Sequence, residues 1–180
     1  DKFISLTESH ASALGTIVPD IVATAKADLL QMEIPTTRHE EWKYTRTTKL
    51  SQENWKFSNA ESKLPNDAFL ISDLNASRIV FVNGKWDASQ SEIKNEAGVS
   101  IFTSENITTD FISKIDITPS ANFFEAFQKA TCTDMVAIHV AKNKIAETPI
   151  HIIHYCDDEH ALSTPSVFVA LDNAGSVPFI

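Results

Sequence analysis

The segments "MVAIHVAK" (residues 135–142), "TPIHIIHYC" (148–156) and "TPSVFVALDNAGSVPFI" (164–180) decide the fold of this chain. Each carries apolar side chains at consecutive positions, is rich in Ile and Val, and is separated from the next by a polar or Pro-bearing turn. Such runs are typical of strands covered on both faces, as in parallel stacks. We therefore predict that the three segments are successive rungs of a parallel coil.

Helical patterns dominate before residue 133. Residues 3–33 predict two helices, because apolar residues recur at spacings of three and four and Pro19 suits the first turn of the second helix. Later, Phe123 and Phe127 lie one turn apart and predict another helix, which Asn122 caps.

A hairpin and a strand are predicted between these helices. "RIVFVNGKW" (78–86) contains an Asn-Gly pair after an apolar run, the strongest short hairpin signal. "GVSIFTS" (98–104) predicts a further strand. We expect an α+β fold with two domains: a mainly helical domain with a small hairpin at residues 1–133, and an incomplete β region at residues 134–180.

The composition limits the classes of partner. The chain has 180 residues, 15 Lys+Arg and 24 Asp+Glu, so its formal net charge is -9. An acidic surface repels phosphate backbones and anionic lipid heads, which disfavours nucleic-acid and membrane roles. No run is long enough to span a bilayer and the start lacks a secretory signal pattern, so we expect a cytoplasmic protein. The sequence does not begin with Met and its last residues are apolar, so we expect a fragment of a longer chain.

A polar and aromatic stretch, "IPTTRHEEWKYTRTTKL" (34–50), stands apart from these patterns. Thr37 and Glu40 have capping-box spacing, which predicts a short helix from His39 to Tyr44. On that helix Trp42 would face Arg46, a pair that could stack on a nucleotide. We favour the alternative that Trp42 and Tyr44 are amphipathic anchors on the domain core, with the charges in solvent.

The other candidate functional residues are histidines and cysteines, which can bind metal ions. His151, His154, Cys156 and His160 lie within ten residues, and Cys132 is the second cysteine. Because side chains alternate along a strand, only His154 and Cys156 share a face, whereas a closed zinc site uses four ligands. We expect no metal site, no other bound cofactor and no catalytic residue in this chain.

Taken in order, "IPTTRHEEWKYT", "RIVFVNGKW", the Phe-rich helix and "ETPIHIIH" resemble the N-terminal portion of the SufD family, subunits of the SufBCD iron–sulfur cluster assembly complex. The most specific match is a set of hallmark residues, which we expect to be structural: Pro35, Arg38, Glu41, Trp42, Tyr44 and Thr45. Near its start, SufB lacks the same Trp-Lys-Tyr arrangement.

The resemblance implies a helical N-terminal region followed by the first rungs of a right-handed parallel β-helix, here truncated. It also implies SufB-like and SufC-like partners, bound through later parts of the chain, with ATP used by SufC and iron–sulfur clusters handled by the intact complex. A homodimer is left open.

Three functions follow from these observations. The first is a non-enzymatic scaffold subunit in iron–sulfur cluster assembly. The alternative is a small metal or cluster carrier that uses Cys156, His154 and Cys132. A third, weaker alternative is a carbohydrate-active β-helix enzyme. It needs paired carboxylates on one face of a rung, whereas Asp157, Asp158 and Glu159 lie together in a predicted turn.

Overall fold

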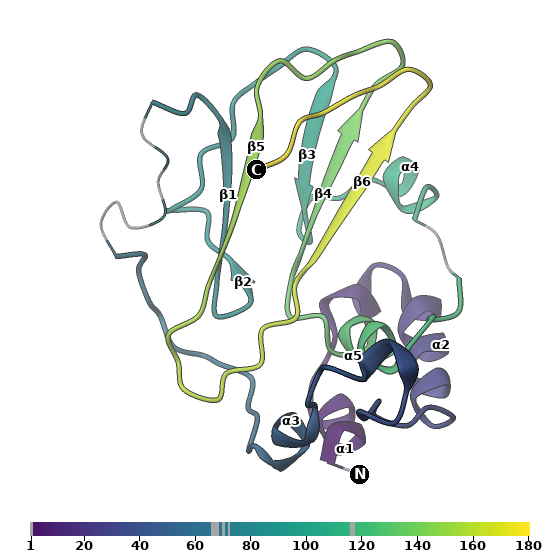
Figure 1. Ribbon diagram of the computed structural model, residues 1–180. Helices are drawn as coiled ribbons and strands as arrows, with labels where there is room; N and C mark the ends of the chain where they lie inside the picture. The colour runs from purple at the N-terminus through teal and green to yellow at the C-terminus, as the bar shows by residue number, and fades with distance from the viewer. Residues whose placement is uncertain (1, 66–68, 70, 72, 116–117) are drawn as a thin grey trace.

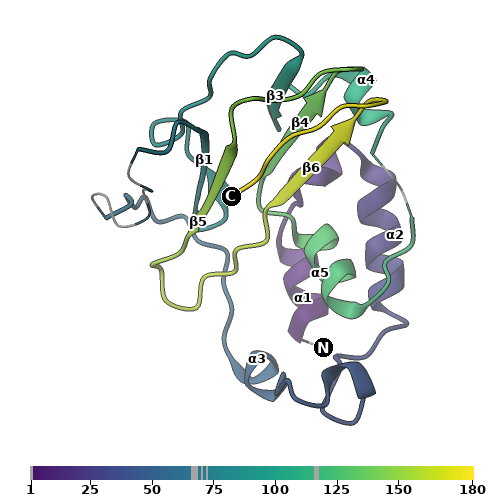
Figure 2. The ribbon, with the colours of Figure 1, turned by 45° about the horizontal axis from the view of Figure 1, so that its top comes forward.

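The computed structural model describes residues 2–65, 69, 71, 73–115 and 118–180. Three helices pack together beside two small β-sheets (Figures 1 and 2). These helices are α1 (Lys2–Ser9), α2 (Pro19–Leu29) and α5 (Phe123–Thr131). The shorter helical elements are η1 (Ala13–Thr16), η2 (Glu40–Trp42), α3 (Thr48–Gln52) and α4 (Thr109–Ile112).

Each sheet has three strands and mixes parallel with antiparallel pairing. One has the order β2-β1-β5 and the other β3-β4-β6. The pairs β1–β5 and β4–β6 are parallel, whereas β1–β2 and β3–β4 are antiparallel. The strands are β1 (Ser77–Val82), β2 (Lys85–Trp86), β3 (Val99–Thr103), β4 (Met135–Val140), β5 (Ile150–Tyr155) and β6 (Ser166–Leu171).

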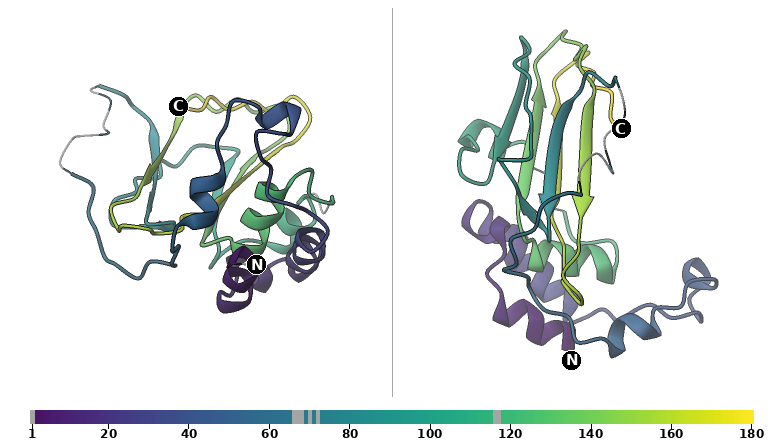
Figure 3. Two further views of the ribbon diagram at one scale, coloured as in Figure 1. Left: turned by 60° about the horizontal axis from the view of Figure 1, so that its bottom comes forward. Right: turned by 90° about the vertical axis from the view of Figure 1, so that its left-hand side faces the viewer.

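The sheets face each other across an apolar core (Figure 3, right). Its buried residues are Ile79 and Phe81 from β1, Val136 and Ile138 from β4, and Ile150 from β5. The other face of β4 presents Met135 and Ala137 to a second core that includes residues of η1, α2 and α4. Strand β4 is therefore covered on both sides, which explains its uninterrupted apolar sequence.

The prediction of a parallel β-helix is wrong. The segments expected to be successive rungs separate into two sheets, because β4 pairs with β6 while β5 pairs with β1. Each sheet also contains an antiparallel pair, and the fold is a mixed α/β arrangement rather than a helical domain followed by a coil. In β4 the consecutive apolar residues are buried on both faces, by the helical layer and by the second sheet, without a stack of coils. Strands β5 and β6 are only partly buried.

The proposed division at residue 133 falls between two elements. Helix α5 ends at Thr131 and strand β4 begins at Met135. Strands from both sides of this point share each sheet, since β1 pairs with β5 and β3 pairs with β4.

The helical predictions for residues 3–33 and the Phe-rich helix are confirmed. Helix α2 begins at Pro19, and in α5 the Asn122 side chain accepts a hydrogen bond from the Glu125 N–H at 3.0 Å. On the inner side of α1, the Phe3 ring meets those of Phe123 and Phe127 edge-on. These rings form the centre of the helical core.

The Asn-Gly hairpin is also confirmed. Asn83 and Gly84 both have positive φ values, 49° and 86°, as a two-residue turn between right-twisted strands requires. The side chain of Asn83 extends the turn to another loop, because its oxygen accepts hydrogen bonds from the Asp157 and Asp158 N–H groups. The predicted strand at residues 98–104 is β3.

Candidate functional site

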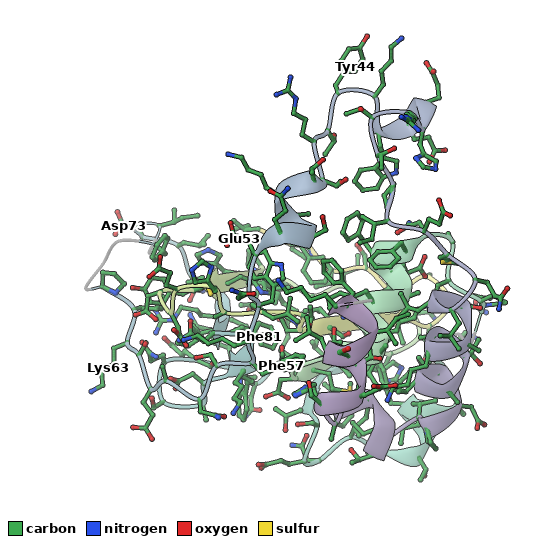
Figure 4. All side chains as sticks on the ribbon, turned by 90° about the horizontal axis from the view of Figure 1, so that it is seen from below. Tyr44, Glu53, Phe57, Lys63, Asp73 and Phe81 are labelled. Carbon is green, nitrogen blue, oxygen red and sulfur yellow. The ribbon has the colours of Figure 1, made fainter. Side chains whose placement is uncertain are left out.

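The hallmark stretch forms a projecting loop, residues 36–46, which we call the arm. It protrudes from the helical side of the molecule, and its base lies between α2 and α3 (Figure 3, right; Figure 4). The base is closed where the buried Thr47 hydroxyl donates a hydrogen bond to the carbonyl of the buried Pro35. A buried hydrogen bond between the two ends of a loop fixes where the loop leaves the core.

A compact turn shapes the first half of the arm. The Thr36 N–H donates to Nδ1 of His39 at 3.0 Å, and the His39 N–H donates to the Thr36 carbonyl at 2.9 Å. The 3-10 helix η2 follows and ends at Trp42. The predicted capping box of Thr37 and Glu40 is wrong, because His39 occupies the N-cap position and its side chain makes no capping hydrogen bond.

Trp42 and Tyr44 lie in different surroundings. The half-buried Trp42 ring packs on Phe124 of α5, with 5.1 Å between ring centroids. Tyr44 is 92% exposed at the tip of the arm and points away from the rest of the molecule (Figure 4). The anchoring prediction is therefore confirmed for Trp42 and wrong for Tyr44.

The predicted contact between Trp42 and Arg46 needs a helix that continues past Trp42, and η2 ends there. Within the described residues, the cation–π contact of the arm is instead made by Lys43, whose Nζ lies 5.8 Å from the centroid of the Tyr44 ring.

A groove of about 410 Å³ runs between the arm and the start of α5. Its floor is largely apolar, whereas three glutamates stand along it. The lining residues are Met32, Glu33, Pro35, His39, Glu40, Glu41, Trp42, Ala121, Asn122 and Phe123. The α5 side of this groove was not anticipated from the sequence. Its signal was the pair Phe123-Phe124, because adjacent helical residues point in different directions. Phe123 is buried in the helical core, whereas Phe124 is only partly buried against that core and also contacts Trp42.

The exposed charges of the arm have no counter-ions within the described part of the chain. Three cations, Arg38, Lys43 and Arg46, and two carboxylates, Glu40 and Glu41, form no ion pair there. Glu33, at the edge of the groove, is likewise unpaired among these residues. Of the six hallmark residues, the structure thus buries Pro35, half-buries Trp42 and exposes Arg38, Glu41, Tyr44 and Thr45.

The two cysteines have different environments. Cys132 is fully buried, and its thiol donates to the carbonyl of Asp134 at 3.0 Å. Burial raises the pKa of the Cys132 thiol to about 11, so the metal-binding thiolate is strongly disfavoured. Cys156 is exposed, and partial burial together with the charge of Asp157 raises its pKa as well.

Two histidines near Cys156 have other partners. The ring of His154 stacks on Phe81, with 5.1 Å between centroids and an interplanar angle of 7°. Nδ1 of His160 lies 3.3 Å from a carboxylate oxygen of Glu53. In the parts of the chain that can be described, no group of three or more His, Cys, Asp and Glu side chains is placed to hold a metal ion.

The acidic run after β5 holds loops together. Lys56 pairs with Asp158 at 2.7 Å, and the Ser58 hydroxyl donates to the same carboxylate at 2.6 Å. These partners keep the pKa of Asp158 below its usual value, and hydrogen bonds from Ser62 and Asn83 do the same for Asp157. Asp157 and Asp158 are thus engaged in contacts between loops.

Comparison with known protein families assigns this chain to a family. The family described as the SufBD protein N-terminal region matches residues 3–152. The chain belongs to the SufBD N-terminal family. The match covers the helical core, the arm, the hairpin and the first half of β5. A search of curated proteins returned no match.

Membership of the SufBD family connects the chain with iron–sulfur cluster assembly and with complexes of the SufBCD type. Among the described residues, no helix combines the length and the apolar character that crossing a bilayer requires.

Proposed function

We propose that the protein is a non-enzymatic scaffold subunit of the SufD type in iron–sulfur cluster assembly. The family match over residues 3–152 carries this proposal. The run Trp42-Lys43-Tyr44 supports the SufD type, because this arrangement distinguishes the SufD-like hallmark from that of SufB. The partners are a SufB-like subunit and a SufC-like ATPase, and the place of work is the cytoplasm.

The structure suggests how the hallmark serves such a role. Pro35 and Trp42 hold the arm on the helical core, while Arg38 and Tyr44 are exposed for contact with another protein. Exposed aromatic and Arg side chains are the residues that most often carry the energy of protein–protein interfaces. A scaffold needs such contacts and no catalytic group of its own.

Affinity purification of the tagged full-length protein from cytosol, followed by mass spectrometry, tests the proposal. We expect recovery of an ABC-type ATPase and of a paralogous SufBD subunit, neither of which should be enriched by an unrelated acidic protein of similar size. Recovery of the full-length protein alone would contradict the scaffold function.

The same preparation tests the alternative of a metal or cluster carrier. If the protein retains iron or zinc, and a Cys156→Ala variant loses it, the carrier function is favoured over the scaffold function. Thiol titration of the purified protein gives an independent readout, because Cys156 is exposed and reacts unless a metal covers it.

A further inference from the structure

The groove between the arm and α5 has an apolar floor and an acidic edge. Met32 and Trp42 line the floor, whereas Glu33, Glu40 and Glu41 line the edge. Among the described residues that form its walls there is no lysine or arginine. Its volume of about 410 Å³ is near the lower end of the range for ligand sites, so the groove suits a short segment rather than a folded domain.

We propose that this groove binds a short basic segment of a partner protein, in which a large apolar side chain lies between Arg or Lys residues. The inference assigns a binding site and the chemistry of its ligand, which the scaffold function does not include, and it does not depend on that function.

The acidic edge is the first argument for a basic ligand. Glu33, Glu40 and Glu41 are exposed, and within the part of the chain that the structure describes none of them forms an ion pair. Basic side chains of a partner supply the missing counter-charges, and complementary charge gives an interface its specificity. The same edge repels phosphates and acidic segments.

A chain segment matches this edge better than a single metal ion does. Over the described residues, no three His, Cys, Asp and Glu side chains are placed to hold a metal ion, so the glutamates do not converge on one point. His39, which also lines the groove, uses Nδ1 to accept the N–H of Thr36 at 3.0 Å. Carboxylates that are spread along an edge fit basic side chains that are spaced along a peptide.

The start of α5, on the other side of the groove, does not favour an anion. The Asn122 side chain accepts the Glu125 N–H at 3.0 Å, and the Glu125 carboxylate accepts the Ala121 N–H at 2.8 Å. Side chains of the same molecule therefore take up these N–H groups and place a negative charge at the positive end of the helix. Helix α5 thus adds no attraction for an acidic ligand.

The apolar floor sets the second requirement for the ligand. Burying a large apolar side chain against Met32 and Trp42 is favourable in proportion to the area removed from water. The long stems of Arg and Lys can cover the apolar rim while their charged ends reach the glutamates. The segment that fits both features has an apolar residue at its centre and basic residues on either side.

Both walls are held in place before a ligand arrives. On the arm side, the Thr47 hydroxyl donates to the Pro35 carbonyl, and the Trp42 ring packs on Phe124 with 5.1 Å between centroids. A site that is already formed loses little conformational freedom on binding, which helps a short ligand to bind.

Fluorine NMR of the intact protein labelled with fluorotryptophan tests the proposal, because Trp42 lines the groove. The Trp42 signal is assigned by its loss in a Trp42→Phe variant. The probe is the peptide Gly-Arg-Leu-Arg-Gly, acetylated and amidated at its ends. We expect a saturable shift of the Trp42 signal that weakens as salt is added, because exposed charges are screened.

Two matched peptides separate the charge from the apolar side chain. Gly-Arg-Ser-Arg-Gly keeps the charges and should bind at least about fivefold more weakly, because it buries no large apolar group. Gly-Glu-Leu-Glu-Gly keeps the leucine and should not shift the Trp42 signal, because its charges are repelled by the edge of the groove.

A variant of the protein tests the edge directly. Glu40→Gln with Glu41→Gln removes two charges at exposed positions and should weaken binding of the basic peptide about two- to tenfold. The matched control, Glu105→Gln with Glu147→Gln, removes two charges at exposed positions that do not line the groove. The control should bind the peptide like the wild type.

Three outcomes would overturn the proposal. The basic peptide could leave the Trp42 signal unshifted at its highest soluble concentration, the glutamate peptide could bind as tightly as the arginine peptide, or the Glu40→Gln, Glu41→Gln variant could bind as tightly as its control. Each outcome is independent of whether partner subunits are recovered from cytosol, so it leaves the scaffold function to its own test.

Discussion

Trp42 and Tyr44 are two positions apart, yet their side chains have different tasks. The indole ring rests on Phe124 and holds the arm against α5, whereas the phenol at the tip is 92% exposed. At the scale of single residues, the hallmark therefore combines structural positions, such as Pro35 and Trp42, with positions that face solvent.

Stability measurements should separate these two roles. We expect Trp42→Ala to lower the free energy of unfolding by about 1–2 kcal/mol, because it removes an aromatic pair from a half-buried site, whereas a fully buried Trp would lose about 3–5 kcal/mol. Tyr44→Ala should stay within about 0.5 kcal/mol of the wild type, as exposed substitutions usually do. Urea unfolding of both variants measures the difference, and equal losses would contradict the assignment.

His10 makes stability depend on pH. Its ring stacks on Phe57 with 3.7 Å between centroids, and Nε2 is buried without a hydrogen-bond partner among the described residues. Burial lowers the pKa of His10, a hydrogen bond with the Cys132 backbone opposes this shift, and the charge of Lys85 adds to it. The unfolded chain therefore binds a proton more readily than the folded one.

It follows that the free energy of unfolding is highest above the unfolded pKa of about 6.5 and falls as the pH drops through the lower folded pKa. The variant His10→Phe keeps a stacked ring and cannot titrate, so its stability should fall less over the same range. The pKa of His154 is also lowered by burial, but its effect is present in both proteins and cancels. Urea unfolding at several pH values between about 8 and 5 measures the two slopes, and parallel curves would refute the role of His10.

At the scale of elements, the hairpin between β1 and β2 links the sheets. Gly84 has φ +86°, and a Cβ there would lie 2.6 Å from Oγ1 of Thr133. That hydroxyl donates to the Gly84 carbonyl at 2.6 Å, which ties the hairpin to the segment before β4. The glycine is therefore required both for the turn and for the close approach of Thr133.

Substitution of two glycines tests this requirement. Gly84→Ala should lower the free energy of unfolding by more than about 1 kcal/mol, because both its backbone angle and the space are unsuited to a side chain. Gly15→Ala is the matched control, since its Cβ would meet only Cγ2 of Val22, at 3.9 Å. The control should be neutral or stabilising by up to about 1 kcal/mol. Similar losses in both variants, measured by thermal or urea unfolding, would argue against a special role for Gly84.

At the scale of the whole molecule, pairing between distant segments builds the two sheets. Strand β1 lies parallel to β5 with Ser77 opposite Ile150, and β4 lies parallel to β6 with Met135 opposite Ser166. The apolar core between the sheets draws side chains from β1, β4 and β5. The helices then cover the second face of β4, which leaves the arm outside the core on the helical side of the molecule.

The sequence by itself determined the local elements. Pro19 and Asn122 marked helix starts, Asn83-Gly84 marked the hairpin, and runs of Ile and Val marked the strands. These signals rest on backbone conformation, capping and periodicity, all of which act over a few residues. The hallmark residues came instead from the resemblance to a family, which rests on a motif in one short segment.

Only the tertiary structure decided which strands pair and how the arm is held. An apolar run predicts that both faces of a strand are covered, but it does not say whether a sheet, a helix or another coil covers them. In the same way, nothing near Trp42 in the sequence indicated that Phe124 would be its partner and that Tyr44 would lie exposed at the tip of the arm. Such contacts join residues far apart in the chain, so they depend on the packing of the whole molecule rather than on local sequence.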